Sequence, residues 1–350
     1  MALVTGPADP RLDLDPWVGQ RQATWRFDLT DAATGASLGE LHPVRAGSLD
    51  HDTTRTIKRT LTLDLHVTDA AAVNPLTDRL TVSMLVAGQT WPLGRYMWTN
   101  DTATTSTGGD RSANQLVDEM FVVDQQIEKG FAPTGNADAA VLDLLAGLPL
   151  VGVSVEATPY LAVGGWGSGT RRGQILDALA TQGDYQTPWI DHNGIFQMVR
   201  TVDPDTAVPA MDLDAGNRVH RDSITRTSDI LDAPNRFVVI SNDGAAAAAP
   251  IVGSFDVPAT APHSIAQRGF VIPDVVTVQL ATQAQATAAA RNLGLRQTIV
   301  ERVELATAPD PRHDGYDVVV WQGAHWLEAA WSLDLAEGGR MRHILLRKFA

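Results

Sequence analysis

The sequence contains no cysteine and only three lysines among its 350 residues. The absence of cysteine excludes disulfide bonds, thiolate zinc sites, thiol nucleophiles and iron–sulfur clusters, but it leaves the redox compartment open. The lysines are Lys58, Lys129 and Lys348, so the other 24 of the 27 basic residues are arginines. This usage is typical of a GC-rich genome and does not by itself indicate a binding device.

Basic charge is also in deficit, because 41 acidic residues outweigh 27 basic ones and leave a formal net charge of −14. Proteins that bind duplex nucleic acid normally use clustered Lys and Arg to displace counterions. The acid excess therefore argues against duplex nucleic acid as the main partner. Aromatic residues make up only 6% of the chain, although nine of them are tryptophans.

Targeting and membrane signals are missing as well. Residues 1–7 lack the basic and apolar stretches of a signal peptide. The longest apolar run, from Leu144 to Val155, is interrupted by Gly and Pro and is too short to span a bilayer. We expect a protein that stays in the cytoplasm where it is made, or that leaves the cell without a signal.

The length predicts two or three domains at about 150 residues each, with enough chain to bury a core. The first 130 residues are mostly of β character, with candidate strands at Trp25–Leu29 and Ala36–Leu41. The clearest strand runs from Thr56 to Val67, where only Arg59 breaks an alternating apolar series. Leu80–Val86 and Gln89–Trp98 flank a predicted hairpin turn at Ala87-Gly88. Thr99–Gly109 is predicted to be an exposed loop. Leu116–Val123 is predicted as a strand, although its Asp-Glu pair also permits a helix.

Residues 131–204 have a different pattern, which predicts a small α/β unit. Helices are expected at Ala139–Leu145, with Asn136 as N-cap, and at Arg172–Thr181, with Thr170 as cap and Gly183 as the stop. Asp191-His192-Asn193-Gly194 then joins two short strands, and Asn-Gly is a strong hairpin signal.

Residues 205–350 return to β character. One Ala-rich helix is expected at Thr282–Leu295, and Gly244–Pro250 is predicted to be a surface loop. The remaining segments of this part are predicted strands: Asn235–Ser241, Val275–Leu280, Gln297–Ala306, Asp317–Trp321, His325–Leu333 and Arg342–Phe349. The order of elements predicts two similar β modules around an insert.

A glycine-rich run, Gly164 to Gly169, precedes the second expected helix and raises the possibility of a phosphate site. A P-loop needs Gly-Lys-Ser/Thr at its end, and here Gly169-Thr170-Arg171 lacks the lysine. A flexible loop capped by Thr170 is the favoured interpretation.

Two polar clusters have residue types suited to a metal or an acid–base site. In Asp50-His51-Asp52, with His42 and His66 nearby, the two aspartates share a face of an extended chain and His51 does not. We favour a solvated loop there, and a turn for Asp310-Pro311-Arg312-His313-Asp314-Gly315, since neither has a known ligand spacing.

Other candidates are weaker. The chain has no Gly-x-Ser-x-Gly elbow, and acidic pairs suited to glycoside hydrolysis arise by chance among 41 acidic residues. Trp91, Trp98, Trp166 and Trp189 could stack on sugars, but their neighbours favour core or interface packing. The C-terminal run Arg340, Arg342, His343, Arg347 and Lys348 alternates with Met341, Ile344 and Leu346, which predicts a strand with one charged face that could meet an acidic neighbour.

Several segments, in this order, resemble one family. They are Pro92–Trp98, Ile175–Ala180 with Trp189–Ile195, Asn235–Val239, and Ala286–Leu295 with the turn at 309–311 and Ser332–Arg347. From about residue 45 onward the chain is similar to the minor tail or tail-tip hub proteins of long-tailed actinobacterial phages, themselves similar to the baseplate hub of contractile tails.

The resemblance implies an α+β, mainly β fold: two tail-tube-like β-barrel modules, at 46–130 and 205–350, with a small α/β domain inserted at 131–204. The second module could also complete the first barrel. Residues 1–45, an N-terminal extension with the first strands, match less well.

The same resemblance implies a homotrimer in the virion tail tip, assembled in the host cytoplasm, whose pseudo-sixfold ring continues the tail tube. Implied partners are the distal tail protein, the tape measure protein, and the central tip fibre or other minor tail proteins. DNA would pass through the lumen unbound, and acidic residues lining it would repel phosphates. No catalytic, cofactor-binding or metal residues and no cofactor are implied, so we expect no enzyme. A β-rich carbohydrate- or host-receptor-binding module is the second hypothesis, and a carboxylate-pair hydrolase is the third.

Overall fold

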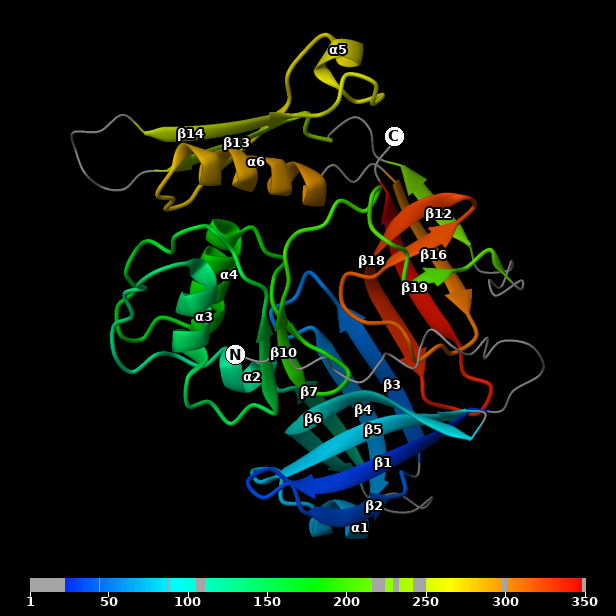
Figure 1. Cartoon of the computed structure of the whole chain (residues 1–350). Helices are drawn as coiled ribbons and strands as arrows, with labels where there is room; N and C mark the ends of the chain where they lie inside the picture. Colours follow the sequence, from blue (N-terminus) through cyan, green and yellow to red (C-terminus); the bar gives the residue numbers. More distant parts are fainter. Residues whose placement is uncertain are drawn as a thin grey trace.

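The computed structural model describes residues 23–43, 45–86, 88–104, 111–215, 224–228, 233–241, 250–297 and 301–347. Three β-sheets organise these residues: one sheet of 13 strands and two of three strands each. Figure 1 shows the large sheet running through the lower and right parts of the molecule, with α3 (Ala137–Leu145) and α4 (Arg172–Gly183) to its left and α5 (Ile265–Arg268) and α6 (Gln283–Gln297) at the top.

The large sheet draws its strands from both ends of the chain. Its members are β1 (Thr24–Asp31), β2 (Ser37–Leu41), β3 (Arg45–Asp52), β4 (Arg59–His66), β5 (Asp78–Val86), β6 (Gln89–Thr104), β7 (Arg111–Asp118), β11 (Met211–Asp212), β12 (Thr225–Ser228), β16 (Glu301–Thr307), β17 (Val318–Trp321), β18 (Ala324–Asp334) and β19 (Met341–Arg347). Their order is β12-β16-β19-β18-β3-β4-β7-β6-β5-β1-β2, with β17 paired to β18 and β11 to β17.

The antiparallel pair β3–β18 joins the N-terminal and C-terminal halves into this one sheet, with Trp331 opposite His51. Within the described residues the path of strands is open and does not close into a barrel. The mainly β class is confirmed, whereas the division into two barrels and an insert stays a prediction.

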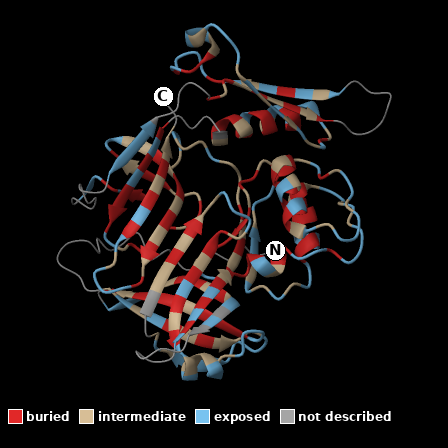
Figure 2. Ribbon diagram, turned by 180° about the vertical axis from the view of Figure 1, so that it is seen from behind, coloured by how far each residue is buried: buried red, intermediate tan, exposed pale blue. Residues whose placement is uncertain are grey.

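The strand predicted at Thr56–Val67 is confirmed as β4. Its inward side chains Leu61, Leu63 and Leu65 are buried, as the alternation requires. The hairpin predicted around Gly88 is also confirmed, since Val86 pairs with Gln89 between β5 and β6. Figure 2 shows buried residues recurring along the strands of this sheet, so the core follows its inner face.

Two predictions next to this region need correction. Thr99–Thr104 continue strand β6 because they pair with β7, so a loop there was wrong; residues 105–110 lie outside the described part. The segment 116–123 divides between strand and helix: β7 ends at Asp118, and α2 (Met120–Val123) follows. A short helix, α1 (Val67–Ala72), leads from β4 toward β5.

The α/β unit between the two halves contains α3 (Ala137–Leu145), α4 (Arg172–Gly183) and a sheet of β8 (Gly152–Val155), β10 (Ile195–Met198) and β9 (Trp189–Ile190). The predicted hairpin is confirmed by the pairing of Phe196 with Ile190. The two helices pack on each other over a core of their own, as Figure 1 shows.

The helix caps in this unit differ from expectation. Asn136 occupies the N-cap position of α3, but its side chain donates to the Thr158 carbonyl instead. The N-cap of α4 is Arg171, because the Thr170 hydroxyl donates back to the Gly167 carbonyl. Gly183 is the last residue of α4, and Asp184, with a left-handed φ of 65°, ends it.

The third sheet, β14 (Ile251–Asp256), β13 (Arg236–Ser241) and β15 (Pro273–Thr277), stands apart from the large one. The predicted Ala-rich helix is confirmed as α6 (Gln283–Gln297), which covers one face of this sheet. The short helix α5 (Ile265–Arg268) lies at its far end (Figure 1). The loop predicted at 244–250 falls almost wholly outside the described residues.

Candidate functional site

The polar cluster predicted as a solvated loop at Asp50–Asp52 is the C-terminal end of strand β3, so that prediction was wrong. The cause is β18, which pairs with this segment from more than 270 positions further along the chain. The predicted facing is nevertheless correct: His51 points inward and is 1% exposed. Its ring stacks on Trp331, with centroids 5.4 Å apart.

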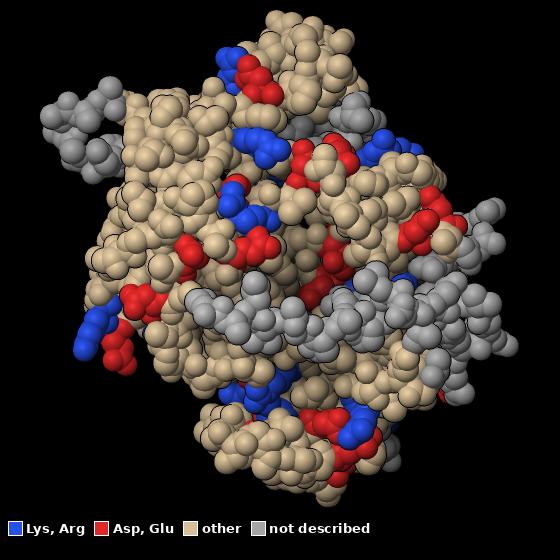
Figure 3. Space-filling model, viewed as in Figure 1, with Lys and Arg blue, Asp and Glu red and all other residues tan. Residues whose placement is uncertain are grey.

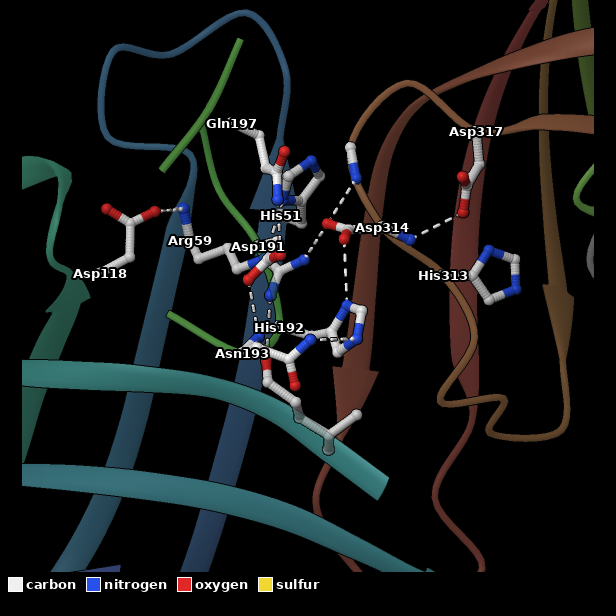
Figure 4. A network of polar contacts seen from close by, with 12 residues as sticks. His51, Arg59, Asp118, Asp191, His192, Asn193, Gln197, His313, Asp314 and Asp317 are labelled. Carbon is white, nitrogen blue, oxygen red and sulfur yellow. Dashed lines mark hydrogen bonds and ion pairs between the residues drawn. The ribbon is translucent and has the colours of Figure 1, made fainter. Parts of the chain in front are cut away.

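Arg59 is the first residue of β4 and points inward, where it lies at the centre of a buried polar network shown in Figure 4. We call this network the junction. It consists of Arg59, His51, Asp118 and Asp314, together with Asp191 and His192 of the β9–β10 hairpin. The Arg59 side chain is 1% exposed. Nη2 donates to Asp314 Oδ1 at 2.5 Å, Nε to His51 Nδ1 at 3.3 Å, and Nη1 to the Leu93 carbonyl at 3.3 Å. The Arg59 amide donates to Asp118 at the end of β7. Arg59, which interrupts the apolar series in the sequence, thus joins four segments.

The segment 310–315 forms turns, as predicted, but its side chains point into the protein. Asp314 lies in the junction, where Oδ1 accepts from Arg59 and Oδ2 is 3.0 Å from His192 Nδ1. The Asp314 amide in turn donates to Asp317. A turn that composition alone would place in solvent therefore carries a largely buried carboxylate, with 15% of the Asp314 side chain exposed.

The hairpin β9–β10 completes the junction. Asp191 holds the hairpin turn, because its Oδ1 accepts from the amides of Asn193 and Ile195. Gln197 donates to the other oxygen of the same carboxylate. This fixed turn presents His192 to Asp314, as Figure 4 shows, so the insert is attached to the large sheet through polar side chains.

The electrostatics of the junction favour fixed charges. Burial works to raise the pKa of the Asp314 carboxyl, but Arg59 and His192 outweigh it and hold that pKa well below its usual range. Burial and the positive charge of Arg59 lower the pKa of His51 to about 3, so its imidazole is neutral. Burial raises the pKa of Asp118 to about 6. Because the charged groups pair with one another inside the protein, the arrangement suits joining segments more than acid–base chemistry.

The other sequence candidates stay apart from the junction. His42 and His66 are exposed, and neither belongs to the group of potential metal ligands found in the described residues. The glycine-rich run 164–169 forms an irregular loop before α4, consistent with the favoured loop interpretation.

The tryptophans pack mainly inside the protein. Trp91 and Trp189 are buried, and the Trp189 ring meets Tyr316 edge-on. Trp98 and Trp166 are half-buried, and Trp166 stacks on Phe131. These positions agree with core packing and give no open aromatic platform among the four.

The C-terminal basic run forms β19, but its predicted single charged face is wrong. Arg342 is exposed, whereas His343 is buried on the inward face between Met341 and Leu345. The acidic neighbour is Glu328 of β18, whose carboxylate lies 2.6 Å from His343 Nδ1. Arg347 lies over the Trp326 ring, and Lys348 is outside the described residues.

The outward face of the large sheet is polar and hollowed. One groove of about 760 Å³ is lined by Asp50, Asp52, Arg340 and Arg342, among others. A second, of about 980 Å³, lies along β3, β4 and β7 and includes Asp64. In the view of Figure 3, acidic and basic side chains are interspersed over the molecule and do not gather into one field.

Sequence reasoning missed Arg59, Glu328, His343 and Asp314 as members of buried clusters. The signal was present at Arg59 and Glu328, because each is a charged residue at an inward position of an otherwise apolar strand. A buried charge requires a partner, although the strand pattern does not name it.

Comparison with known proteins gives likeness in structure only. The chain matches no protein-family model, and no curated protein matches its sequence. In the described residues, no helix is long and apolar enough to cross a membrane.

Solved structures with a similar fold cover nearly the whole chain. A tail protein from Neisseria meningitidis superposes with a TM-score of 0.62 at 12% identity, over 93% of this chain and 97% of that one. A 43 kDa prophage tail protein from Shewanella oneidensis gives 0.60 at 11% identity, over 92% and 98%. A prophage tail protein from Listeria monocytogenes gives 0.59 at 8% identity, over 93% and 95%. The chain therefore has the fold of these three tail proteins over 92–93% of its length.

Proposed function

We propose that this chain is a structural component of a phage tail, and specifically the hub of a tail tip or baseplate. The observation that carries the proposal is the fold, shared with three tail proteins over more than 90% of both chains in each comparison.

The junction supports a static role. Arg59 and Asp314 form an ion pair, and His192 contacts the same carboxylate, so strand β4, the 310–317 loop and the inserted hairpin are joined. Such an arrangement stiffens the chain and leaves its charged groups committed to each other. We infer no enzymatic activity, no catalytic residues and no catalytic cofactor.

In the finer form of the proposal, three chains assemble into a ring. Modules 46–130 and 205–350 act as two tail-tube-like barrels per chain, and 131–204 is the insert. The ring continues the tail tube of a long-tailed, actinobacterial phage and receives the central tip fibre or other minor tail proteins. The distal tail protein and the tape measure protein are its further partners, and residues 1–45 are an N-terminal extension with the first strands.

This hub is part of the DNA-ejection channel of the virion and is assembled in the host cytoplasm. Each chain brings a formal charge of −14, so an acidic lining repels DNA phosphates and lets the genome pass without binding.

Mass measurement in solution tests the assembly. Size-exclusion chromatography with light scattering of the full chain, at several protein concentrations, should give the mass of three chains, and electron microscopy of that peak should show threefold rings. Mixing with the distal tail protein should shift the peak. The hub proposal would be refuted if the protein is a monomer at all concentrations, does not bind the distal tail protein and binds glycans. That result would favour the carbohydrate-binding alternative.

A further inference from the structure

A second buried polar cluster lies on the inward face of the large sheet, apart from the junction's ion pair. It consists of His313, Glu328 and His343, whose side chains are each at most 1% exposed. The Nδ1 atoms of His313 and His343 approach the two carboxylate oxygens of Glu328 at 2.5 and 2.6 Å. One ligand-type atom from each residue lies within 4.8 Å of the others.

The fold aims these three side chains at one point. Glu328 comes from β18, His343 from the neighbouring strand β19, and His313 from the loop between β16 and β17. The β18–β19 register shifts between Glu328 and Ala330, the mark of a β-bulge. Because of this extra residue, Glu328 and then Trp331 both face inward, where a regular alternation would turn one of them out.

The outer contact of His343 suits a metal-bound imidazole. Thr307 Oγ1 lies 2.8 Å from His343 Nε2 and also 2.8 Å from the Ala308 carbonyl oxygen. A hydroxyl has one hydrogen, so when Thr307 donates it to Ala308, its oxygen can accept from a hydrogen on His343 Nε2. An imidazole with its hydrogen on Nε2 has a lone pair on Nδ1, which is the atom that faces the Glu328 carboxylate.

We propose that this cluster binds a divalent first-row transition metal ion such as Zn²⁺. The ligand atoms are Nδ1 of His313, Nδ1 of His343 and the carboxylate of Glu328. A metal on Nδ1 leaves His343 neutral, with its Nε2–H donating to Thr307. This outer hydrogen bond is the pattern of metal-bound histidines. Two imidazoles and one carboxylate suit zinc and its neighbours, whereas Ca²⁺ and Mg²⁺ prefer oxygen ligands throughout.

Binding requires a small movement of the side chains. Metal–ligand bonds of about 2.0–2.2 Å at tetrahedral angles separate ligand atoms by roughly 3.3 Å. Each Nδ1 now lies 2.5 or 2.6 Å from a different oxygen of Glu328, so the carboxylate must turn to offer one oxygen to the ion and the ligand atoms must move apart. A fourth position remains for water or another group.

The role that follows is structural, because all three side chains are buried. The ion links β18, β19 and the loop that carries Asp314, and it thereby holds Asp314 in place for Arg59. This proposal does not depend on the tail-hub assignment.

Metal content and metal uptake test it. Full chain purified without chelator and with no histidine tag should contain about one equivalent of Zn²⁺ or a related metal by inductively coupled plasma mass spectrometry. After removal of the metal, Co²⁺ added to the wild-type chain should give the visible absorption bands of a nitrogen–oxygen site, with one equivalent at saturation, and Zn²⁺ should abolish them.

Variants locate the site. Glu328→Gln and His343→Gln should each lose the bound metal and the Co²⁺ spectrum. His325→Gln, on the same strand β18 but with its ring at the Pro204 carbonyl, is the matched control and should keep both. If a cluster variant does not fold, the wild-type Co²⁺ titration decides alone. A wild-type chain that takes up neither Co²⁺ nor Zn²⁺, or folded cluster variants that keep the metal, would overturn the proposal.

Discussion

Replacing Arg59 by methionine tests whether the junction holds the fold together. The methionine fills much of the same space, but it removes the guanidinium from His51, from the Leu93 carbonyl and from Asp314. The Asp314 carboxylate is then left buried, with only His192 and the Gly315 amide as neighbours. The expected loss is therefore dominated by an uncompensated charge.

The size of the loss follows from the burial of the pair, whose side chains are 1% and 15% exposed. Removing one partner of a buried ion pair costs about 3–5 kcal/mol, because the other charge stays out of water. Removing the charge of Asp314 as well, as Asn, keeps a polar group for His192 and cancels most of that penalty. We expect the double variant Arg59→Met/Asp314→Asn to lose only about 1–2 kcal/mol.

Urea unfolding followed by tryptophan fluorescence measures these free energies. Arg26→Met is the control, because Arg26 pairs with Asp28 on the surface with 47% of its side chain exposed, and its loss should stay within about 0.5 kcal/mol. The reasoning is refuted if Arg59→Met costs no more than Arg26→Met, or if the double variant is as unstable as the two single losses added together.

Two further predictions concern pH and packing. Burial and the charge of Arg59 lower the pKa of His51 to about 3 in the folded protein, although Asp314 and Glu328 act in the opposite direction. In the unfolded chain His51 has its ordinary pKa of 6.5. The unfolded state therefore binds a proton that the folded state does not, and the free energy of unfolding should fall as the pH drops from 6.5 toward 3, by about 2 kcal/mol at pH 5. Urea unfolding of the wild type and of His51→Gln at pH 7 and pH 5 measures this loss, which should be about 2 kcal/mol larger in the wild type. An equal loss of stability in both proteins would contradict the prediction. Gly253→Ala should destabilise the protein by about 1–3 kcal/mol, because the added Cβ would overlap the Ala286 backbone of α6. Gly165→Ala is the control: its added Cβ meets no atom within 4 Å, so the loss should be less than about 1 kcal/mol. Equal urea unfolding midpoints for the two variants would contradict the prediction.

Local patterns in the sequence were sufficient for much of the secondary structure. The alternation of Leu61, Leu63 and Leu65 predicts a half-buried strand, and the Asn193-Gly194 pair predicts a hairpin, because both signals are set by neighbours in the chain. The helix caps were less predictable. Thr170 is a good N-cap type, but its hydroxyl finds the Gly167 carbonyl, so competition among nearby acceptors decided the outcome.

The polar sites depend on partners that no local pattern reveals. Asp50–Asp52 has the composition of a turn, yet it is a strand because β4 and β18 pair with its two edges. The Asp310–Gly315 turn was predicted correctly as a turn. Its burial could not be predicted, because it depends on Arg59, more than 250 positions earlier in the chain.

One arrangement unites the clusters. In the order β19-β18-β3-β4, four adjacent strands place His343, Glu328, His51 and Arg59 at inward positions. Two successive loop residues close this row: His313 contacts Glu328 and Asp314 contacts Arg59. Strands β18 and β19 belong to the C-terminal half and β3 and β4 to the N-terminal half, so the loop bridges the β3–β18 seam where the halves meet. Buried polar contacts need their partners in place to offset desolvation, and sliding one half along the other would break both ends of the bridge together. The row of polar residues therefore adds to the β3–β18 backbone pairing a set of side-chain contacts that only one register between the two halves can make.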